Sequence, residues 1–326
     1  MKRTVIAAGA TLLAREIVKR RMRYDVQGKV ALVTGGSRGL GFAIAAELAE
    51  RGARVVICAR DEERLERARS LLAARGADVR ALRCDVGDKA QVDELIAQTG
   101  RVDILVNNAG VIAVGPLETQ RVEDFEQLHA AMFWGVVYPT LAVLPQMTEH
   151  GEGRIVNVTS IGGKVSVPFL LPYCAAKFGA VGFSQGLRTE LAGKRILVTT
   201  VVPGLMRTGS YRAALFKGRR TTMYNLFAPL STLPLTTISA ARAARKIVRA
   251  LERGDPELIL TAHANVMVRL NGIAPATMQR ALGIVARALP HGGGVEPVPG
   301  RNLGSPIDRS VLTALGRKAA TDLNQR

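Results

Sequence analysis

The chain has 326 residues, of which 48% are hydrophobic, which is enough for one large α/β domain with additions and too many for a disordered chain. Its formal net charge is +18, but only 4% of its residues are aromatic and it has no recognised nucleic-acid-binding motif, which argues against a nucleic-acid partner. Cys58, Cys84 and Cys174 and the scattered histidines lack metal-ligand spacing, so no metal site is expected, and the odd number of cysteines suits a reducing compartment.

Residues 1–25 are the first predicted element, a basic and apolar N-terminal helix. The apolar run 4–14 is shorter than the roughly 20 residues that a membrane-spanning helix needs. It leads into a basic stretch rather than a small-residue cleavage site, and residues 1–23 carry a net charge of +6. Three interpretations stay open: a helix lying on a membrane surface, a helix packed on the body of the protein, and a signal or anchor segment.

Residues 26–262 are predicted to form a single α/β domain. Apolar strands alternate with amphipathic helices, a pattern that is typical of a parallel sheet with helices on both faces. The expected strands are 30–36, 54–60, 79–86, 102–110, 154–160, 196–204 and 257–261. We therefore predict a doubly wound, Rossmann-type domain with a parallel seven-stranded sheet, in which residues 205–238 form a variable substrate lid.

Residues 263–326 are predicted to be a helical C-terminal extension. The segment 258–295 contains no acidic residue, and four of its apolar residues share one face of a predicted helix: Met278, Leu282, Val285 and Leu289. That helix packs either on the domain or on a membrane surface. A loop rich in Gly and Pro is expected at 290–304, followed by a short terminal helix.

A glycine-rich turn follows the first predicted strand, in the stretch Thr34–Gly41. A turn of this kind between a strand and a helix lets backbone N–H groups approach a pyrophosphate at the helix N-terminus. Its T-G-x-x-x-G-x-G spacing resembles that of the short-chain dehydrogenase/reductase family. The resemblance implies a nicotinamide dinucleotide held by Gly35, Ser37, Arg38, Gly39, Leu40 and Gly41.

Two arginines predict which dinucleotide binds. An NAD site usually has a carboxylate at the end of the second strand, whereas an NADP site has arginine near the 2′-phosphate. Here Arg60 follows Ala59 at that strand end, and Arg38 lies in the glycine-rich turn. Asp61 comes one position too late and is interpreted as the N-cap of the next helix. We therefore expect NADP(H) as the cofactor.

Further motifs extend the resemblance over about residues 26–260. Asp85 matches the family's adenine contact, and the N-N-A-G stretch begins with Asn107, which the resemblance implies stabilises the sheet. The P-G-x-x-x-T segment implies contacts to the nicotinamide carboxamide. The additional cofactor residues implied by these motifs are Asp85, Val86, Asn108, Ala109, Gly110, Pro203, Gly204 and Thr208.

The predicted chemical centre combines Ser160 with a Tyr-x-x-x-Lys pair. Tyr173 and Lys177 lie four residues apart and so share one helix face. A free Tyr has a pKa of about 10, and the ammonium and an oxidised nicotinamide ring both favour its phenolate, so that Tyr173 can act as acid or base near neutrality. The resemblance implies that Tyr173 is the general acid or base and that Ser160 binds the substrate oxygen. Both Tyr173 and Lys177 are also expected to contact the cofactor.

One position departs from the family pattern. Met132 stands where the family usually has an Asn that helps to hold a water linking the lysine to solvent. A thioether accepts hydrogen bonds only weakly and cannot donate them. Three consequences are open: backbone groups hold the water, turnover is slow, or the protein binds NADP(H) without useful catalysis.

The expected substrate is a large apolar ketone, aldehyde or alcohol, such as a steroid, a retinoid or an acyl lipid. The lid and the loop after Ser160 supply apolar side chains that either form the substrate walls or pack the lid onto the domain: Leu205, Met206, Tyr211, Leu215, Phe216, Met223, Tyr224, Leu226, Phe227, Leu230, Ile161, Val165, Val167, Phe169 and Leu170. Five lid cations, Arg207, Arg212, Lys217, Arg219 and Arg220, either meet an anionic group or form a solvated rim.

The sequence therefore predicts an NADP(H)-dependent oxidoreductase, with a non-catalytic NADP(H)-binding regulator or scaffold at a membrane surface as the alternative. Residues 207–253 carry a net charge of +9, which together with the basic N-terminus favours an anionic membrane surface as a partner. A homodimer or homotetramer is expected. We also expect a cytoplasmic location, either free or peripheral on the cytoplasmic face of a membrane.

Overall fold

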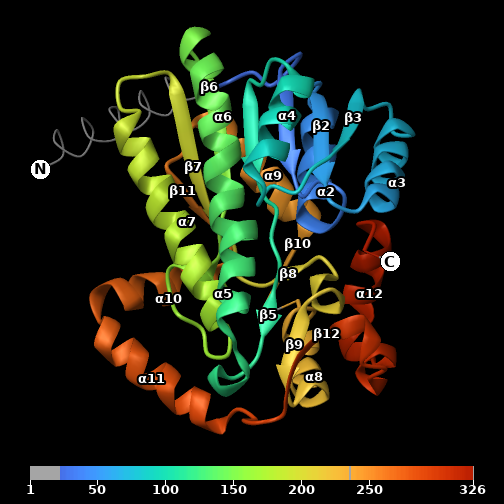
Figure 1. Cartoon of the computed structure of the whole chain (residues 1–326), viewed down its shortest axis with the longest axis vertical. Helices are drawn as coiled ribbons and strands as arrows, with labels where there is room; N and C mark the ends of the chain where they lie inside the picture. Colours follow the sequence, from blue (N-terminus) through green and yellow to red (C-terminus); the bar gives the residue numbers. More distant parts are fainter. Residues whose placement is uncertain (1–22, 235, 326) are drawn as a thin grey trace, which may run out of the picture.

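The fold centres on one parallel sheet. A computed structural model describes residues 23–234 and 236–325, so the predicted N-terminal helix 1–25 falls almost entirely outside the described residues. The predicted seven-stranded parallel sheet is confirmed, with strand order β11-β7-β6-β4-β1-β2-β3 (Figure 1). Its strands are β1 (Val30–Thr34), β2 (Arg54–Ala59), β3 (Val79–Arg83), β4 (Ile104–Asn107), β6 (Gly153–Val158), β7 (Ile196–Val202) and β11 (Glu257–Ile259).

Helices cover both faces of the sheet, which is why its central strands are apolar throughout. In β1 the side chains of Ala31 and Val33 pack into one core, whereas those of Val30 and Leu32 pack into the other. Successive residues of a strand point to opposite faces, so both faces need an apolar cover. The first core is completed by α2 (Gly39–Glu50), α3 (Glu62–Ala73) and α9 (Ala240–Arg253), and the second by α4 (Lys89–Thr99), α6 (Gly135–Glu149) and α7 (Leu171–Glu190).

A long helical span crosses the second face. It consists of α5 (Val122–His129), a π-helical turn (Ala130–Trp134) and α6. Among the described residues, Val122–Glu149 is the one span long and apolar enough to cross a membrane. It packs against α4 and α7 and contributes Val143 and Met147 to the second core, which accounts for its apolar composition.

The predicted lid is a folded layer at one end of the sheet. It contains β8 (Met206–Arg207), β9 (Leu215–Gly218), α8 (Arg220–Leu230) and β10 (Ile238–Ser239), with a 3₁₀ turn at Ser210–Arg212. Two small sheets contain its strands. β8 pairs with β10, and β9 lies between β5 (Ala113–Val114) and β12 (Gly294–Pro299).

The C-terminal extension is helical as predicted, with one difference. It contains α10 (Ala262–Ile273), α11 (Pro275–Ala288) and α12 (Ala314–Asp322), which form an arm and a terminal helix around the lower half of the molecule (Figure 1). The segment 290–304, expected to be a loop, contains β12, which pairs antiparallel with β9. That pairing joins residues far apart in sequence, so no local pattern predicts it.

Candidate active site

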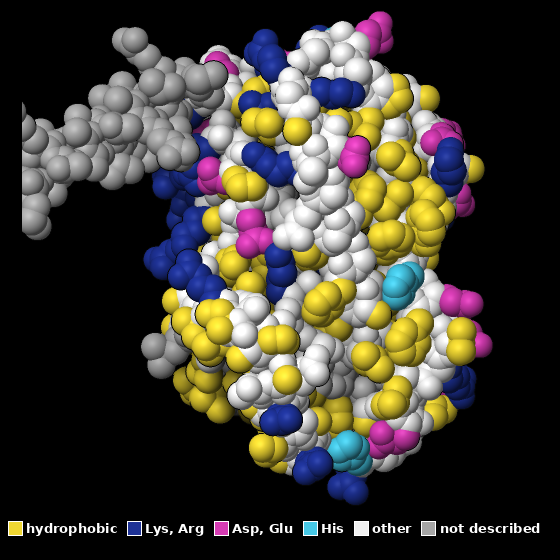
Figure 2. All heavy atoms as spheres, turned by 90° about the vertical axis from the view of Figure 1, so that its left-hand side faces the viewer, with side chains coloured by type: hydrophobic (Ala, Val, Ile, Leu, Met, Phe, Trp, Pro, Cys, Tyr) yellow, Lys and Arg dark blue, Asp and Glu magenta, His cyan; other side chains and the backbone are white. Residues whose placement is uncertain are grey.

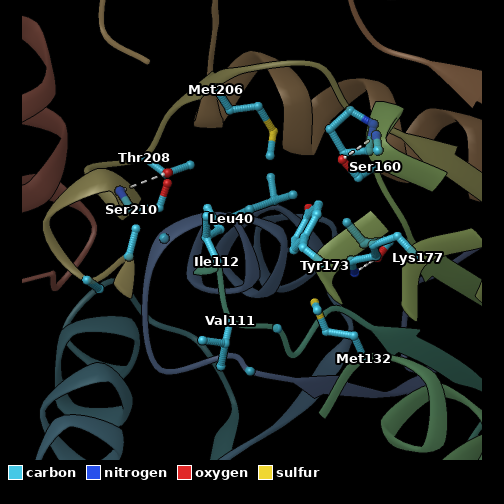
Figure 3. Close-up of a pocket in the computed structure, with 18 of the residues that line it drawn as sticks. Leu40, Val111, Ile112, Met132, Ser160, Tyr173, Lys177, Met206, Thr208 and Ser210 are labelled. Atoms are coloured by element: carbon cyan, nitrogen blue, oxygen red, sulfur yellow. Dashed lines mark hydrogen bonds between the residues drawn. The ribbon is translucent and has the colours of Figure 1, made fainter. Parts of the chain in front are cut away.

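A cavity of about 770 Å³ lies at the carboxyl ends of the central strands. Open α/β sheets bind ligands at this edge, where neighbouring strands connect in opposite directions. The glycine-rich turn, the ends of β2, β4, β6 and β7, the lid, and the α10–α11 arm all contribute to its walls. Figure 3 shows residues from several of these segments facing the same space, among them Leu40, Ile112, Ser160 and Thr208.

The glycine-rich turn has the close backbone approach expected of a pyrophosphate cradle. Gly35 and Gly39 have φ values of 62° and 60°, which favour glycine. A Cβ on Gly35 would lie 2.8 Å from the Cα of Ala109. Gly35, Ser37, Arg38, Gly39 and Leu40 line the cavity, so these residues fit a dinucleotide phosphate.

Gly41 has a different role from the one expected. It does not line the cavity, and a Cβ there would lie 2.3 Å from the carbonyl oxygen of Gly35 and 2.4 Å from Nδ2 of Asn108. The glycine therefore allows α2 to pack closely on the turn and the end of β4, and the expected direct contact with the cofactor is not supported by its position.

Arginines gather at the end of the cavity beside β2 and β3. Arg38, Arg60 and Asp85 all line this end, as predicted, and Arg60 pairs with Asp85 at 3.6 Å. Burial, followed by the nearby charges of Arg64 and Arg301, lowers the pKa of Arg38 to about 10, so Arg38 is still charged at neutral pH. The charge density at this end fits an anionic group such as a phosphate.

Two of these arginines were not predicted as site residues. Arg64 lies in the first turn of α3 and lines the cavity, and its buried Nε has no hydrogen-bond partner among the described residues. Arg301 comes from the C-terminal extension; its charge acts on Arg38, but it does not line the cavity. Arg64 follows Asp61, whose side chain caps α3 as predicted by accepting the Arg64 backbone N–H at 3.0 Å. The cap indicated this helix start but not that Arg64 faces the site.

The asparagine pair after β4 fixes neighbouring strands. Asn107 is buried, and its Nδ2 donates to Asn157 Oδ1 and to Thr140 Oγ1, both at 2.9 Å, which links β4 to β6 and α6. The backbone N–H of Asn108 donates to Thr34 Oγ1 at 2.9 Å. Asn107 thus has the stabilising role expected of it, and Asn108, Ala109 and Gly110 line the cavity.

The three predicted catalytic residues face one region of the cavity (Figure 3). Ser160 lies two residues after the end of β6, and its Oγ accepts the backbone N–H of Gly162 at 3.0 Å. Tyr173 and Lys177 come from α7, one turn apart, as their spacing predicts. Lys177 is buried, and its Nζ donates to the carbonyl oxygen of Val158 at 3.0 Å.

Burial dominates the acid–base properties of this pair. It raises the pKa of Tyr173 to about 12, with a hydrogen bond from Ser160 acting in the opposite direction. Burial also lowers the pKa of Lys177 to about 8. In this structure Lys177 Nζ bonds the Val158 carbonyl, and desolvation is the largest influence on the Tyr173 pKa. The lowering of that pKa by Lys177 together with an oxidised nicotinamide ring stays a prediction.

Met132 lies beside this centre, within the π-helical turn between α5 and α6. Its side chain is fully buried and packs with Ala176 and Tyr173. A Cβ on Gly110 would lie 3.6 Å from its sulfur. The residue thus occupies the edge of the chemical centre, as its alignment with the family's Asn predicts, and gives that edge an apolar surface.

The apolar side chains of the lid divide between the two roles that the sequence left open. One group lines the cavity: Leu205, Met206, Met223, Leu226, Phe227 and Leu230 from the lid, with Ile161, Val167 and Leu170 from the loop after Ser160. A second group packs inside the lid layer: Tyr211, Phe216, Tyr224 and Phe169. Leu215 packs beside Met132, and Val165 is buried away from the cavity wall. The lid therefore has a core of its own and presents a separate apolar face to the site.

The lid cations do not line the cavity. Lys217 is buried and pairs with Asp124 of α5. Arg207 donates to Thr237 Oγ1 at 2.8 Å. The cavity wall includes none of the five lid cations, of which the other three are Arg212, Arg219 and Arg220. An anionic substrate group held by these residues inside the site is therefore not supported.

The remaining predicted residues line the cavity, and the C-terminal extension adds unexpected ones. Val86, Pro203, Gly204 and Thr208 are on the wall, and Thr208 Oγ1 accepts the Ser210 N–H at 3.2 Å. The unpredicted residues are His263, Met267, Val285, Leu289 and Gln325. Only the shared helix face of Val285 and Leu289 gave a sequence signal, and it did not reveal that the face lies against the site.

Comparison with known proteins agrees with this geometry. Residues 29–216 match the family model described as short chain dehydrogenase. The chain is 33% identical over 260 residues to a Mycobacterium tuberculosis protein named "Putative oxidoreductase SadH", covering 78% of this chain and 94% of that protein. The chain therefore belongs to the short-chain dehydrogenase/reductase family, whose members are oxidoreductases that bind nicotinamide cofactors.

Solved structures support the same assignment but differ in cofactor. A Burkholderia phymatum short-chain dehydrogenase/reductase in complex with NAD is 26% identical, with a TM-score of 0.71 and coverage of 78% of this chain and 96% of that chain. A Burkholderia cenocepacia short-chain dehydrogenase in complex with NADP is 27% identical, with a TM-score of 0.66 and coverage of 79% and 99%. Family membership therefore leaves the choice of dinucleotide to this chain's own residues.

Proposed function

We propose that this oxidoreductase uses NADP(H) to interconvert a large apolar ketone or aldehyde and the corresponding alcohol. The observation that carries the proposal is the position of Ser160, Tyr173 and Lys177. They face a cavity that has arginines at one end and apolar side chains at the other. Because all three of these residues are present, an enzyme is favoured over the alternative suggested by Met132, a non-catalytic regulator or scaffold.

The arginine-rich end supports NADP(H) over NAD(H). Arg38 and Arg60 stand where the extra 2′-phosphate would bind, with Arg64 beside them. The two carboxylates on the wall near them are each paired with an arginine, Asp85 with Arg60 at 3.6 Å and Asp61 with Arg64 at 3.3 Å. Guanidinium groups bind phosphate through paired, charge-assisted hydrogen bonds, so this environment favours the phosphorylated dinucleotide.

The opposite end supports an apolar substrate. Its walls come from the lid and from the arm, which contributes Met267, Val285 and Leu289. Sites that enclose apolar ligands are typically lined by such side chains, with few polar groups to fix orientation. Ser160 and Tyr173 are polar groups of the cavity wall that belong to the predicted chemical centre, so the reacting oxygen of the substrate is expected to lie against them.

The chemistry follows from what each side chain can do. The nicotinamide ring, when bound, supplies or accepts the hydride. Ser160 holds the substrate oxygen, and Tyr173, which like a free tyrosine is protonated at neutral pH, donates the proton to that oxygen during reduction. Lys177 is expected to bind the nicotinamide ribose and, when charged, to ease ionisation of Tyr173 in the reverse direction.

A reduction assay tests the function directly. The purified protein is incubated with NADPH or NADH and a lipid extract, and products are identified by mass spectrometry. We expect NADPH-dependent conversion of an apolar carbonyl compound to its alcohol. Failure to bind either dinucleotide would overturn the cofactor proposal, whereas binding without any reduction would favour the regulator or scaffold.

We also propose that the α10–α11 arm contacts an anionic lipid surface. Ile273 and Ile284 on the arm are 82% and 68% exposed, and α11 buries no residue. The arm also helps to line the substrate cavity, which would let an apolar substrate enter from a lipid phase. Sedimentation with anionic vesicles tests this. The double variant Ile273→Ser with Ile284→Ser should pellet less than the wild-type protein, whereas the distant Val311→Ser should pellet equally well. Equal pelleting of the wild type and both variants would reject the proposal.

A third proposal concerns assembly. Trp134, Leu141 and Phe178 are exposed on the α6 and α7 side, and hydrophobic side chains gather on that side of the molecule in Figure 2. Exposed apolar surface of this kind suits a contact with a second copy of the chain. Sedimentation equilibrium should give a dimer or tetramer, and Leu141→Arg with Phe178→Arg should give monomers. A monomeric wild-type protein would contradict the proposal.

A further inference from the structure

The C-terminal residues 323–325 are docked on the glycine-rich turn. The N–H of Gly39, the first residue of α2, donates to the carbonyl oxygen of Leu323 at 2.9 Å. Asn324 Nδ2 donates to the carbonyl oxygens of Ser37 and Arg64, both at 2.9 Å. Chain ends usually fray unless they are tied down, and these bonds tie this end to two separate segments of the site.

The docking position spans the arginine-rich end of the cavity. Ser37 belongs to the glycine-rich turn and Arg64 to the first turn of α3, so Asn324 bridges the two walls that flank Arg38 and Arg60. Asn324 is buried and has a φ of 55°, a left-handed conformation that asparagine tolerates better than most residues. A sharp bend at this residue then directs Gln325 toward the cavity.

Gln325 is the residue that points to a ligand. Its side chain lines the cavity and is 9% exposed, yet its buried Oε1 has no hydrogen-bond partner among the described residues. Its Nε2 lies 2.7 Å from where a Cβ on Gly39 would stand, and Cβ of Thr208 lies 3.8 Å from the same position. Buried polar groups are normally satisfied, so a carboxamide that lies against the pyrophosphate cradle calls for a partner inside the cavity.

Residues 323–325 directly follow α12, which packs on the lid. A Cβ on Gly209 would lie 2.6 Å from Cβ of Ala320, and a Cβ on Gly316 would lie 2.3 Å from Cγ2 of Thr232. Such close approaches hold the terminal helix against the lid without intervening side chains. The tail therefore joins the substrate lid to the cofactor cradle.

We propose that residues 323–325 form a strap that closes over the bound dinucleotide and that Gln325 hydrogen-bonds it directly. A carboxamide suits this ligand because Nε2 donates to a phosphate oxygen while Oε1 accepts from a ribose hydroxyl. The proposal rests on the proposed NADP(H) function. It adds a cofactor contact from outside residues 29–216, the part of the chain that matches the family model.

The strap has a kinetic consequence. A dinucleotide beneath residues 323–325 leaves only after the bonds of Leu323 and Asn324 to the turn have opened. Loss of the Gln325 contact should therefore increase the dissociation rate of the dinucleotide more than it changes the association rate, as is usual for contacts formed after encounter.

The test compares near-isosteric variants. Gln325→Met keeps the length of the side chain and removes both hydrogen-bonding groups, whereas Gln325→Glu places a carboxylate beside the phosphates. We expect NADPH affinity, measured by fluorescence titration, to fall about tenfold for Met, the worth of one or two hydrogen bonds, and further for Glu. Gln279→Met, on the exposed side of α11, is the control and should bind as the wild type does.

Three results separate the explanations. Unchanged NADPH affinity in Gln325→Met would overturn the inference while leaving the proposed function intact. Tighter binding in that variant would also overturn it, since the tail would then compete with the cofactor. Absence of dinucleotide binding by the wild-type protein would instead overturn the proposed function. Urea unfolding midpoints of all variants should match, so that a change in affinity reports contact rather than folding.

Discussion

The cofactor cradle and the C-terminal extension enclose the same cavity by different means. The cradle is built from backbone: glycines at 35, 39 and 41 and the strand ends around them leave no room for side chains. The extension is built from side chains on helices of low burial, and α11 buries none of its residues. Backbone geometry constrains the sequence tightly, whereas a wall of side chains can change with the substrate.

This contrast assigns separate tasks to the cradle and to the α10–α11 arm of the extension. Changes in the cradle and its catalytic trio should alter cofactor binding or the chemical step for every substrate. Changes in the α10–α11 arm should alter substrate affinity and leave the chemical step intact.

The largest effect is expected at Tyr173. Tyr173→Phe keeps the ring and its packing but removes the proton donor, so turnover should fall roughly 10²–10⁴-fold, the usual worth of general acid–base catalysis. NADPH affinity should be nearly unchanged. The measurement is steady-state reduction of any ketone that the wild type accepts, beside a fluorescence titration of NADPH. Turnover at the wild-type rate would show that the active site has been misassigned.

The predictability of the fold follows the same division. The strands of the main sheet were predictable because most of them are short apolar runs bounded by turns, and burial on both faces requires that pattern. The strands β5, β8, β9, β10 and β12 were not, because they lack such a run and form through pairing within the lid or with segments distant in sequence. Their formation depends on tertiary packing, which leaves little local signal.

The site residues also differ in how far the sequence predicts their positions. Ser160, Tyr173 and Lys177 were predictable because motif spacing places them on one strand end and one helix face. Gln325 was not, because its position results from a bend at Asn324 after a helix packed on the lid. The burial that raises the pKa of Tyr173 to about 12 was also not predictable, since the sequence reveals the neighbouring cation but not how far the phenol is removed from water.

The second effect concerns the choice of dinucleotide. Two charge-assisted contacts at about 1.5–3 kcal/mol each should give NADPH at least a hundredfold preference over NADH. Arg38 is the more buried of the two arginines, whereas the Arg60 side chain is 60% exposed and forms an ion pair with Asp85. Arg38→Ala should therefore lose more of the preference for NADPH than Arg60→Ala. Arg60→Asp should shift the choice toward NADH. Fluorescence titrations with both dinucleotides measure this, and equal wild-type affinities would refute it.

A third, smaller effect is expected on varying pH. Lys177 has a pKa lowered to about 8, so its charged form predominates below that pH and is lost above it. Tyr173, at about 12, keeps its proton over the same range. If ribose binding needs the ammonium, kcat/KM for reduction should be level below about pH 8 and fall roughly tenfold per pH unit above it.

The matched control for that profile is Lys177→Arg. Arginine keeps its charge throughout the accessible pH range, so any activity left in this variant should show no decline near pH 8. A decline at the same pH in both proteins would assign it to another group. A level wild-type profile up to about pH 10 would show that the charge of Lys177 is not needed or that bound cofactor raises its pKa.

The smallest effect is expected at Met132, where the cradle meets the substrate region. Its thioether is buried against Tyr173 and Ala176, in a π-helical turn whose backbone already departs from α-helical hydrogen bonding. Met132→Asn restores a side chain able to hold water, so the rate should be preserved or rise by a few-fold at most. The cost of burying an amide should appear as a lower urea midpoint. Loss of turnover in Met132→Asn, in a folded protein that still binds NADPH, would give Met132 a substrate-specific role. The division between the cradle and the α10–α11 arm would then fail at this residue.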